Sequence, residues 1–327
     1  MSTATAEVQQ LVSAGRYAEA AGLLHAAAAK GDGDALYKLA TWRVSGQIIR
    51  RDTTAARGLM GRAAEAGHAE AALIHAHFLA NGTGGPTYWR RARAILERLA
   101  PNPAATEQLQ MLERMAVDAN GEPTCEIRTE TLSERPAVFA SRGFFTPEEC
   151  AYVARKAEPR LQPSMVTHRE TGKLIAHPVR KSDGTFFGVA TEDLVISVLN
   201  RRIAAACGTN ADQGEPLQIL RYPPGGEFRP HHDFVANENN QRILTALVYL
   251  SERYEGGETE FVRTGLSFKG STGDLLFFRN VTPKGDPDEL AEHAGLPVRA
   301  GVKLVASRWI WRAPPGFEPP VPAVPGY

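Results

Sequence analysis

The sequence predicts an α+β protein, with an α-helical repeat region first and a strand-rich region after it. Two observations indicate this division. The first third of the 327 residues is rich in alanine and repeats itself, whereas the part after Leu217 has short β-branched and aromatic segments between glycine and proline turns. The length also exceeds one typical domain. We therefore expect a helical repeat domain over 1–116, a linker over 117–136 and a second domain over 137–327.

The N-terminal third repeats with a shift of 36 residues. This shift takes Gly31 to Gly67 and aligns ALYKLA at 35–40 with AALIHA at 71–76. Small residues at regular positions let antiparallel helices pack closely, and glycines favour the ends of helices. A period of this size is typical of a helix-turn-helix solenoid. Two to three such units fit within the first 116 residues.

The segment AAEAGHAEA at 63–71 resembles the tetratricopeptide family, and more closely its alanine- and glycine-rich Sel-type relatives. The resemblance implies a short array whose concave face binds a protein or peptide partner. A structural role, in which the array caps or dimerises the following domain, is the alternative. His75 and His77 are two positions apart, which directs them to different sides of a helix, so we expect packing or surface histidines there.

The second domain is predicted to begin with a linker or a first strand, followed by a helix. NGEP at 120–123 has the composition of a turn, and we expect the stretch up to Pro136 to be the linker or the first strand. The helix is predicted to start at Thr146. Its hydroxyl can cap the helix, Pro147 suits the first turn and Glu149 completes a capping box.

Several short segments downstream have the composition of strands. Four of them are 217–222, 243–250, 275–278 and 302–312, each bounded by glycine or proline. Several short strands at this spacing predict a β-barrel or β-sandwich. The sequence ends in a proline-rich stretch from Pro314, which favours an extended tail.

The composition excludes several function classes. Lysine plus arginine equals aspartate plus glutamate, at 37 each, which argues against a nucleic-acid-binding protein. No apolar run reaches the length of a membrane span, and the N-terminus lacks the features of a secretory signal. Cys125, Cys150 and Cys207 are far apart and form no CxxC pair. We expect three free thiols and a cytoplasmic location.

A histidine and an aspartate two positions apart give the strongest functional signal. In PHHDF at 230–234, His231 and Asp233 leave the same face if the segment is an extended strand. His293 supplies a third ligand. Two imidazoles and one carboxylate hold non-haem Fe(II) and leave positions open for a co-substrate and oxygen. His232 points to the opposite face of a regular strand, so we expect it to pack or to support a ligand.

The run from Leu217 to Trp311 resembles the prolyl 4-hydroxylase branch of the Fe(II)/2-oxoglutarate-dependent dioxygenases. The motifs that carry the resemblance are, in chain order, LQILRY at 217–222, PHHDF at 230–234, GGETEF at 256–261, GDLLFF at 273–278, HAGLPV at 293–298 and GVK at 301–303. Upstream, RKSDGTF at 180–186 is similar to the substrate-proximal loop of the family. The likeness extends from near Phe139 to Arg312.

The resemblance implies a double-stranded β-helix, or jelly roll, with supporting helices and the iron at one mouth. It implies that His231, Asp233 and His293 bind the iron and that no catalytic residue is needed beyond the metal centre. Lys303 would pair with the distal carboxylate of 2-oxoglutarate, and Tyr249 would hydrogen-bond the same group. A buried carboxylate needs such a cation and hydroxyl donor.

Three further residues are candidates for the same pocket. Tyr222 matches a tyrosine near the co-substrate and the metal, with an ordinary barrel-lining tyrosine as the alternative. Trp309 shares a strand face with Lys303, so we expect it to wall the pocket. Arg180 is a candidate for substrate binding. One departure from the family pattern is Arg279, where an aromatic or small residue is expected.

The implied activity is an Fe(II)- and 2-oxoglutarate-dependent hydroxylation that uses O2, releases succinate and CO2, and has ascorbate as a candidate reductant. The expected substrate is proline-like. The helical repeats favour a prolyl residue in a peptide. A free cyclic amino acid, such as proline or pipecolic acid, would need an arginine for its carboxylate, for which Arg180, Arg242 and Arg308 are candidates. A protein-binding adaptor or oxygen sensor is the alternative, which the intact ligand set opposes.

Overall fold

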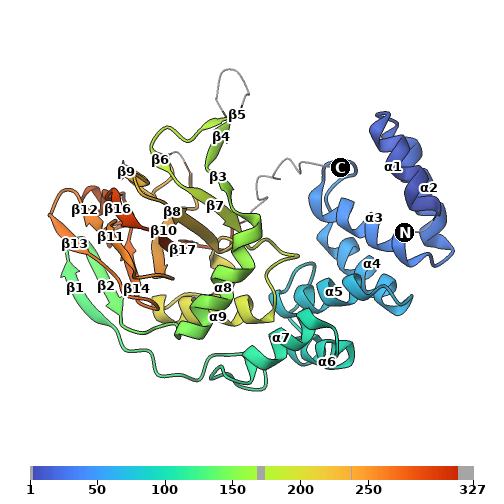
Figure 1. Ribbon diagram of the computed structural model, residues 1–327, viewed down its shortest axis with the longest axis horizontal. Coiled ribbons are helices and arrows are strands. Elements are labelled where there is room, and N and C mark those ends of the chain that lie inside the picture. Colours follow the sequence, from blue (N-terminus) through green and yellow to red (C-terminus); the bar gives the residue numbers. More distant parts are fainter. Residues whose placement is uncertain (1–2, 168–173, 237, 316–327) are drawn as a thin grey trace. The chain divides into compact units, whose positions relative to one another are not determined.

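The computed structural model describes residues 3–167, 174–236 and 238–315 (Figure 1). The chain divides into two compact units. Of the described residues, the first holds those up to Thr124 together with Gly188–Val198, and the second holds Cys125–Phe187 and those from Leu199 to 315. No sequence pattern assigned Gly188–Val198 to the first unit, and the boundaries drawn from the sequence stay predictions. The predicted proline-rich tail lies, from residue 316 on, outside the described residues.

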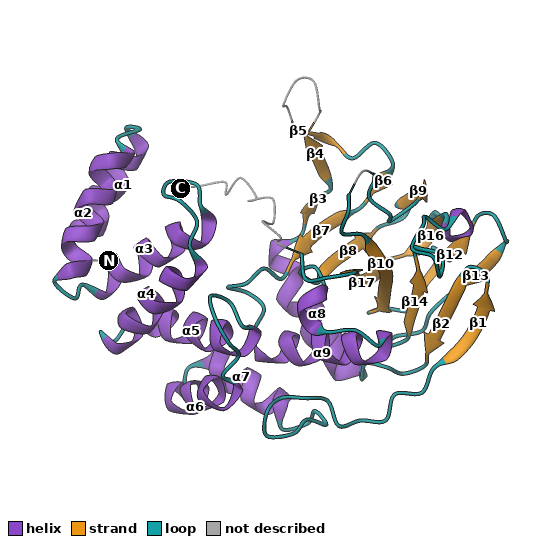
Figure 2. Ribbon diagram, turned by 180° about the vertical axis from the view of Figure 1, so that it is seen from behind, coloured by secondary structure: helices purple, strands orange, loops and turns teal. Residues whose placement is uncertain are grey.

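Antiparallel helices build the first unit. They are α1 (Thr3–Ser13), α2 (Tyr17–Ala29), α3 (Gly33–Ser45), α4 (Thr53–Glu65), α5 (Ala69–Asn81), α6 (Trp89–Leu99) and α7 (Pro103–Leu112). The predicted repeat is confirmed, because adding 36 to the bounds of α2 and α3 gives the bounds of α4 and α5. The helix pairs α2–α3 and α4–α5 are therefore two repeat units, and α6, which begins 36 residues after α4, starts a further helix pair with α7 (Figure 2).

Glycines end the repeat helices as the pattern predicts. Gly46 and Gly82 follow α3 and α5 with φ of 71° and 79°, a left-handed conformation that glycine adopts without strain. The core between the helices is apolar, with Leu24, Met60 and Phe78 fully buried. Many alanines fill the rest of this core, which lets the helices lie close together.

The two histidines of α5 pack separately. His77 is buried, with Nδ1 2.9 Å from the carbonyl oxygen of Ala190 and Nε2 3.3 Å from the amide of Gln108. His75 is half-buried, and burial lowers its pKa to about 4, with Arg57 adding to the effect. Both histidines are packing residues, as the helical spacing predicts.

The second unit contains two antiparallel sheets. The larger has the order β1 (Glu130–Glu134), β2 (Ala137–Ser141), β14 (Leu275–Arg279), β10 (Arg242–Tyr249), β17 (Lys303–Trp311), β8 (Gln218–Tyr222), β7 (Asp183–Phe186), β3 (Gln162–Pro163). The smaller has the order β13 (Leu266–Phe268), β12 (Thr259–Phe261), β15 (His293–Gly295), β9 (Glu227–His231), β6 (Arg180–Lys181). Two further pairs are β11 (Tyr254–Gly256) with β16 (Val298–Gly301), and β4 (Met165–Thr167) with β5 (Leu174–Ala176).

The predicted elements of this unit are present. The four predicted strands are β8, β10, β14 and β17, each within one residue of its expected bounds. β1 lies inside the stretch that was expected to be a linker or a first strand, and it pairs with β2. The capping box at the start of α8 (Pro147–Ala157) is formed, since Thr146 and Glu149 exchange two hydrogen bonds of 2.9 and 3.2 Å.

The two sheets enclose an apolar core. Side chains of the larger sheet, such as Leu276 and Phe278, pack against Phe261 and Phe268 of the smaller one. Helix α8 lies against the other face of the larger sheet, where the thiol of Cys150 approaches the carbonyl of Tyr249. This arrangement is the predicted jelly roll. The three cysteines are free thiols, also as predicted.

Strand register places the candidate residues on the inner face of the larger sheet. Lys303 of β17 lies opposite Tyr222 of β8, and Trp309 lies opposite Thr245 of β10. Directly opposed residues of antiparallel strands share a face, and residues two apart in one strand share it too. Lys303 and Trp309 therefore line the same face.

Candidate active site

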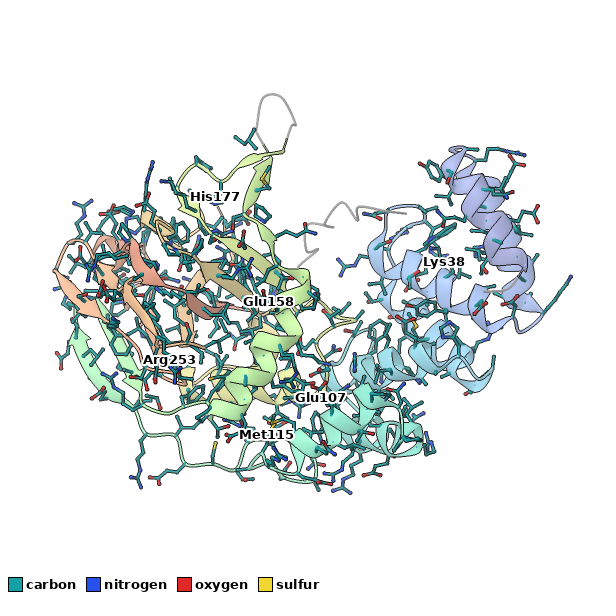
Figure 3. All side chains as sticks on the ribbon, viewed as in Figure 1. Lys38, Glu107, Met115, Glu158, His177 and Arg253 are labelled. Carbon is teal, nitrogen blue, oxygen red and sulfur yellow. The ribbon has the colours of Figure 1, made fainter. Side chains whose placement is uncertain are left out.

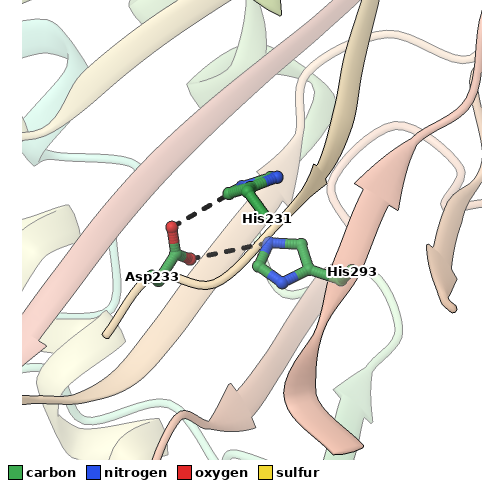
Figure 4. Close-up of side chains that lie close together, drawn as sticks. All are labelled: His231, Asp233 and His293. Carbon is green, nitrogen blue, oxygen red and sulfur yellow. Dashed lines mark ion pairs between the residues drawn. The ribbon is translucent and has the colours of Figure 1, made fainter. Parts of the chain in front are cut away.

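Two histidines and one aspartate meet at the mouth of the jelly roll. His231 ends β9 and His293 begins β15, and these neighbouring strands place the two residues opposite each other. Asp233 follows His231 by two residues. Its Oδ1 lies 3.7 Å from Nε2 of His231 and its Oδ2 lies 3.6 Å from Nε2 of His293 (Figure 4). One ligand atom from each of the three residues lies within 4.8 Å of the others, so the predicted set is brought together.

Backbone carbonyls orient both imidazole rings. Nδ1 of His231 lies 2.8 Å from the carbonyl oxygen of Arg229, and Nδ1 of His293 lies 3.0 Å from that of Ala291. A carbonyl only accepts, so each Nδ1 carries the proton and each Nε2 keeps its lone pair. Nε2 of His231 is buried without a hydrogen-bond partner among the described residues. This is how metal-binding histidines are held.

The electrostatics of the cluster also fit a divalent cation. Burial, with the neighbouring His293 adding to its effect, lowers the pKa of His231 to about 4. Burial opposes ionisation of Asp233, but His293, His231 and a hydrogen bond from Thr245 outweigh burial and lower the pKa of Asp233. At neutral pH the cluster thus offers a carboxylate and a neutral imidazole, the protonation states that metal ligands need. Nitrogen and oxygen donors of this kind suit Fe(II).

Aromatic rings fix the two histidines from the side. The ring of Phe228 stacks on His231 with centroids 3.5 Å apart, and Phe278 meets His293 edge-on at 4.7 Å. The two imidazole rings are themselves 4.3 Å apart. These contacts exclude water from one side of the cluster.

The two other histidines near the motif lie outside the cluster. Nε2 of His232 is 3.7 Å from Glu289, and 31% of its side chain is exposed. His177 lies between β5 and β6 (Figure 3), where it accepts a 3.4 Å hydrogen bond from the amide of Val179. Neither histidine belongs to the group formed by His231, Asp233 and His293.

Lys303 is a buried cation beside the cluster. Its Nζ donates to the carbonyl of Gly257 at 2.7 Å and lies 5.5 and 5.4 Å from the ring centroids of Tyr222 and Tyr249. Burial lowers its pKa to about 8, partly offset by Glu258. Among the described residues, no carboxylate forms an ion pair with it. A buried ammonium that forms no ion pair is suited to an acidic ligand.

Two hydroxyl groups meet between the larger sheet, which carries Tyr249, and the smaller sheet, which carries Thr259. The hydroxyl of Tyr249 lies 2.7 Å from Oγ1 of Thr259, and both residues are buried. A Cβ at Gly270 would lie 2.3 Å from Cδ2 of Tyr249, so the ring of Tyr249 fits in this position because residue 270 has no side chain. Sequence reasoning missed Thr259, although it lies within GGETEF, one of the motifs already quoted. Tyr222 is buried near Arg180 and Asp233, and burial raises its pKa.

The three candidate arginines have different surroundings. Arg308 is buried on the opposite face from Lys303 and donates to the carbonyls of Glu215 and Asn200, so it cannot reach the pocket. Arg242 pairs with Glu215 at 2.6 Å and lies 4.3 Å from the ring centroid of Trp309. Arg180, on β6, makes one long hydrogen bond of 3.5 Å to Gln218, and its buried Nε has no partner among the described residues.

Comparisons with known proteins agree with this geometry. Residues 217–311 match the 2OG-Fe(II) oxygenase superfamily, a segment that includes the three clustered ligands and Lys303. Prolyl 4-hydroxylase 1 of Arabidopsis thaliana is 34% identical over 226 residues, which cover 63% of this chain and 80% of that protein. Probable prolyl 4-hydroxylase 3 of the same plant is 36% identical over 206 residues, or 56% of this chain and 71% of that protein.

Solved structures show weaker overall similarity. A viral collagen prolyl hydroxylase from Paramecium bursaria Chlorella virus 1, in complex with 2-oxoglutarate, is 26% identical with a TM-score of 0.44 and covers 54% of this chain and 96% of that chain. A Sel1 repeat protein from Oxalobacter formigenes is 28% identical with a TM-score of 0.27 and covers 28% of this chain and 71% of that chain.

The jelly roll and its clustered ligands define a 2-oxoglutarate- and Fe(II)-dependent oxygenase. Within that class, the identity to curated relatives over most of their length shows that the chain belongs to the prolyl 4-hydroxylase family. The chain is thus a dioxygenase that uses Fe(II) and 2-oxoglutarate, as predicted. In the described parts of the chain, none of the helices is both long and apolar enough to cross a membrane.

Proposed function

We propose that this chain hydroxylates the ring of a prolyl residue in a peptide, with release of succinate and CO2. The observation that carries the proposal is the His231, Asp233 and His293 cluster beside the uncompensated cation of Lys303. The curated relatives are named prolyl 4-hydroxylases, which supports a prolyl substrate.

Each residue has a distinct task in this proposal. His231, Asp233 and His293 hold the iron, which supplies the oxidising chemistry when it is bound with 2-oxoglutarate and O2. Lys303 pairs with the distal carboxylate of 2-oxoglutarate, and the hydroxyls of Tyr249 and Thr259 are placed to orient that group. Such fixed donors hold the co-substrate without reorganisation during the reaction.

The substrate side of the site is assigned to Trp309, Arg242, Tyr222 and Arg180. The ring of Trp309 is held against Arg242, so it offers a rigid apolar wall for a proline ring. The guanidinium of Arg180 lies near Tyr222 and Asp233, and its buried Nε has no hydrogen-bond partner among the described residues. It would bind a carbonyl oxygen of a peptide substrate.

A free cyclic amino acid is the second candidate substrate. The observation that favours it is again Arg180, because a desolvated guanidinium whose Nε has no partner in the described parts of the chain also suits the carboxylate of proline or pipecolic acid. Arg308 is not available for this task, since backbone carbonyls occupy its donors.

The test is succinate release by the full chain with Fe(II) and 2-oxoglutarate, combined with mass spectrometry of the acceptor. Poly-L-proline and proline-containing peptides form one arm, and free L-proline and L-pipecolic acid form the other. We expect a gain of one oxygen atom on the peptides and none with the His293→Ala variant. Hydroxylation confined to the free amino acids would refute the peptide substrate.

Arg180→Met provides a sharper test of the substrate side. We expect the KM of the hydroxylated substrate to rise while the affinity for 2-oxoglutarate stays within about twofold of wild type, because Lys303 is untouched. The matched control is Arg229→Met, which removes an exposed arginine of the neighbouring strand.

A further inference from the structure

A chain of three polar side chains runs behind the metal cluster. Oγ1 of Thr245 lies 2.6 Å from Oδ2 of Asp233, and the amide Nδ2 of Asn280 lies 2.9 Å from the same Oγ1. All three residues are buried, with Thr245 1% and Asn280 2% exposed. They come from three separate parts of the second unit, so no local pattern in the sequence links them.

The hydrogen bonds in this chain have a defined direction. The amide of Asn280 can only donate to Oγ1, which uses a lone pair of the Thr245 hydroxyl. The hydroxyl then has one proton to give, and Asp233 accepts it at 2.6 Å, whereas the carbonyl oxygen of Asn280 is 3.4 Å away. A carboxylate is also the stronger acceptor. Asn280 therefore aims the proton of Thr245 at Asp233.

The two supporting residues are themselves held firmly. Thr245 lies within β10, opposite Phe278 on one side and Trp309 on the other. Asn280 follows β14, and its backbone donates to the carbonyl of Ile243 at 3.0 Å and accepts from Asp288 at 3.1 Å. Both side chains thus start from backbone that the sheet fixes.

Asp233 has no such backbone hydrogen bonds to the other described residues. It lies two residues beyond the end of β9, in an irregular segment. The rotation of its carboxylate about the Cβ–Cγ bond therefore depends on what its oxygens contact. Thr245 holds Oδ2, and the other oxygen, Oδ1, is directed to His231.

We infer that Thr245, aimed by Asn280, is a positioning residue that sets the rotation of the Asp233 carboxylate and thereby the metal affinity of the centre. The inference rests on the ligand assignment in the proposed function but not on the substrate. Partners that orient metal ligands typically change metal affinity by about 10- to 100-fold when they are removed. The alternative is that Thr245 and Asn280 only satisfy each other as buried polar groups.

The test measures metal binding rather than turnover. Mn(II) is titrated into the full chain without substrate, and the free ion is followed by electron paramagnetic resonance. Thr245→Val removes the hydroxyl and keeps the shape, and we expect the Kd for Mn(II) to rise by about 10- to 100-fold. Thr245→Ser keeps the hydroxyl, and we expect a Kd within about threefold of wild type. Asn280→Leu should weaken binding in the same direction.

A double variant separates an indirect role of Asn280 from a direct one. If Asn280 acts through Thr245, then Thr245→Val combined with Asn280→Leu should bind Mn(II) no more weakly than Thr245→Val alone. A Kd of Thr245→Val within twofold of wild type would overturn the inference while leaving the ligand assignment intact. If the wild-type protein does not bind Mn(II), both the inference and the ligand assignment are overturned.

Folding of each variant is checked by its melting temperature without metal. If Thr245→Val does not fold, Thr245→Ser and Asn280→Leu still decide the question. If Asn280→Leu then binds Mn(II) as tightly as the wild type, the inference is overturned. If Asn280→Leu binds Mn(II) more weakly while Thr245→Ser keeps the wild-type affinity, the inference is supported.

Discussion

Replacing Lys303 by methionine is expected to weaken the binding of 2-oxoglutarate while stabilising the protein without ligand. Methionine keeps an unbranched side chain and removes the charge. With the cation gone, a bound carboxylate would be buried without a partner. Loss of one member of a buried ion pair costs about 3–5 kcal/mol, which corresponds to an increase in Kd of about 10²- to 10³-fold or more.

The gain in stability follows from the pKa of Lys303. Burial lowers this pKa from 10.5 to about 8. The pKa of Lys303 is lower in the folded protein than in the unfolded chain, so the charged form of Lys303 destabilises the folded protein. This destabilisation is complete below pH 8 and disappears above pH 10.5. At neutral pH this destabilisation of the folded protein amounts to about 3 kcal/mol. Lys303→Met removes this unfavourable contribution, so we expect a higher melting temperature without ligand.

The same pKa predicts how 2-oxoglutarate binding depends on pH. Above about pH 8 the free protein loses the Lys303 proton. Binding then requires uptake of a proton, so the Kd should rise about tenfold for each further pH unit.

Isothermal calorimetry with Mn(II) in place of iron measures the Kd of both proteins at pH 7 and 9, and differential scanning calorimetry measures stability. Wild-type affinity in Lys303→Met, or a lower melting temperature of that variant, would refute the reasoning.

Three further substitutions test other parts of the structure. His231→Ala should abolish Mn(II) binding whereas His232→Ala should retain it within about threefold, because only His231 lies in the cluster; equal losses would contradict the assignment. Gly270→Ala should destabilise the protein by about 1–3 kcal/mol in urea unfolding, since its Cβ would lie 2.3 Å from Tyr249, and an unchanged midpoint would argue against this packing. Arg202→Met should cost about 3–5 kcal/mol, because it leaves the buried Glu149 carboxylate without the partner that now lies at 2.6 Å. A loss below 1 kcal/mol would show that the pair contributes little.

The sequence by itself determined the features that depend on short spacings. The 36-residue period takes the bounds of α2 and α3 to those of α4 and α5, because local signals mark most of these helix ends. Asp32, Asp52 and His68 cap the starts of α3, α4 and α5, and Gly46 and Gly82 follow α3 and α5. Thr146, Pro147 and Glu149 form the predicted cap for the same local reason. The spacing of His231 and Asp233 indicated a metal site, because side chains two residues apart in an extended segment leave the same face, and both residues do lie in the cluster.

The tertiary structure alone decided which distant groups meet. Arg180, Arg242 and Arg308 are equivalent candidates in the sequence, yet strand alternation turns Arg308 to the outer face and Arg242 pairs with Glu215. Arg180 has a buried Nε without a hydrogen-bond partner among the described residues. The contacts of Thr259 with Tyr249 and of Thr245 with Asp233 likewise arise from strand register. Register is set by the packing of whole sheets, which joins residues far apart in the chain. A pattern within a short segment therefore cannot predict such contacts.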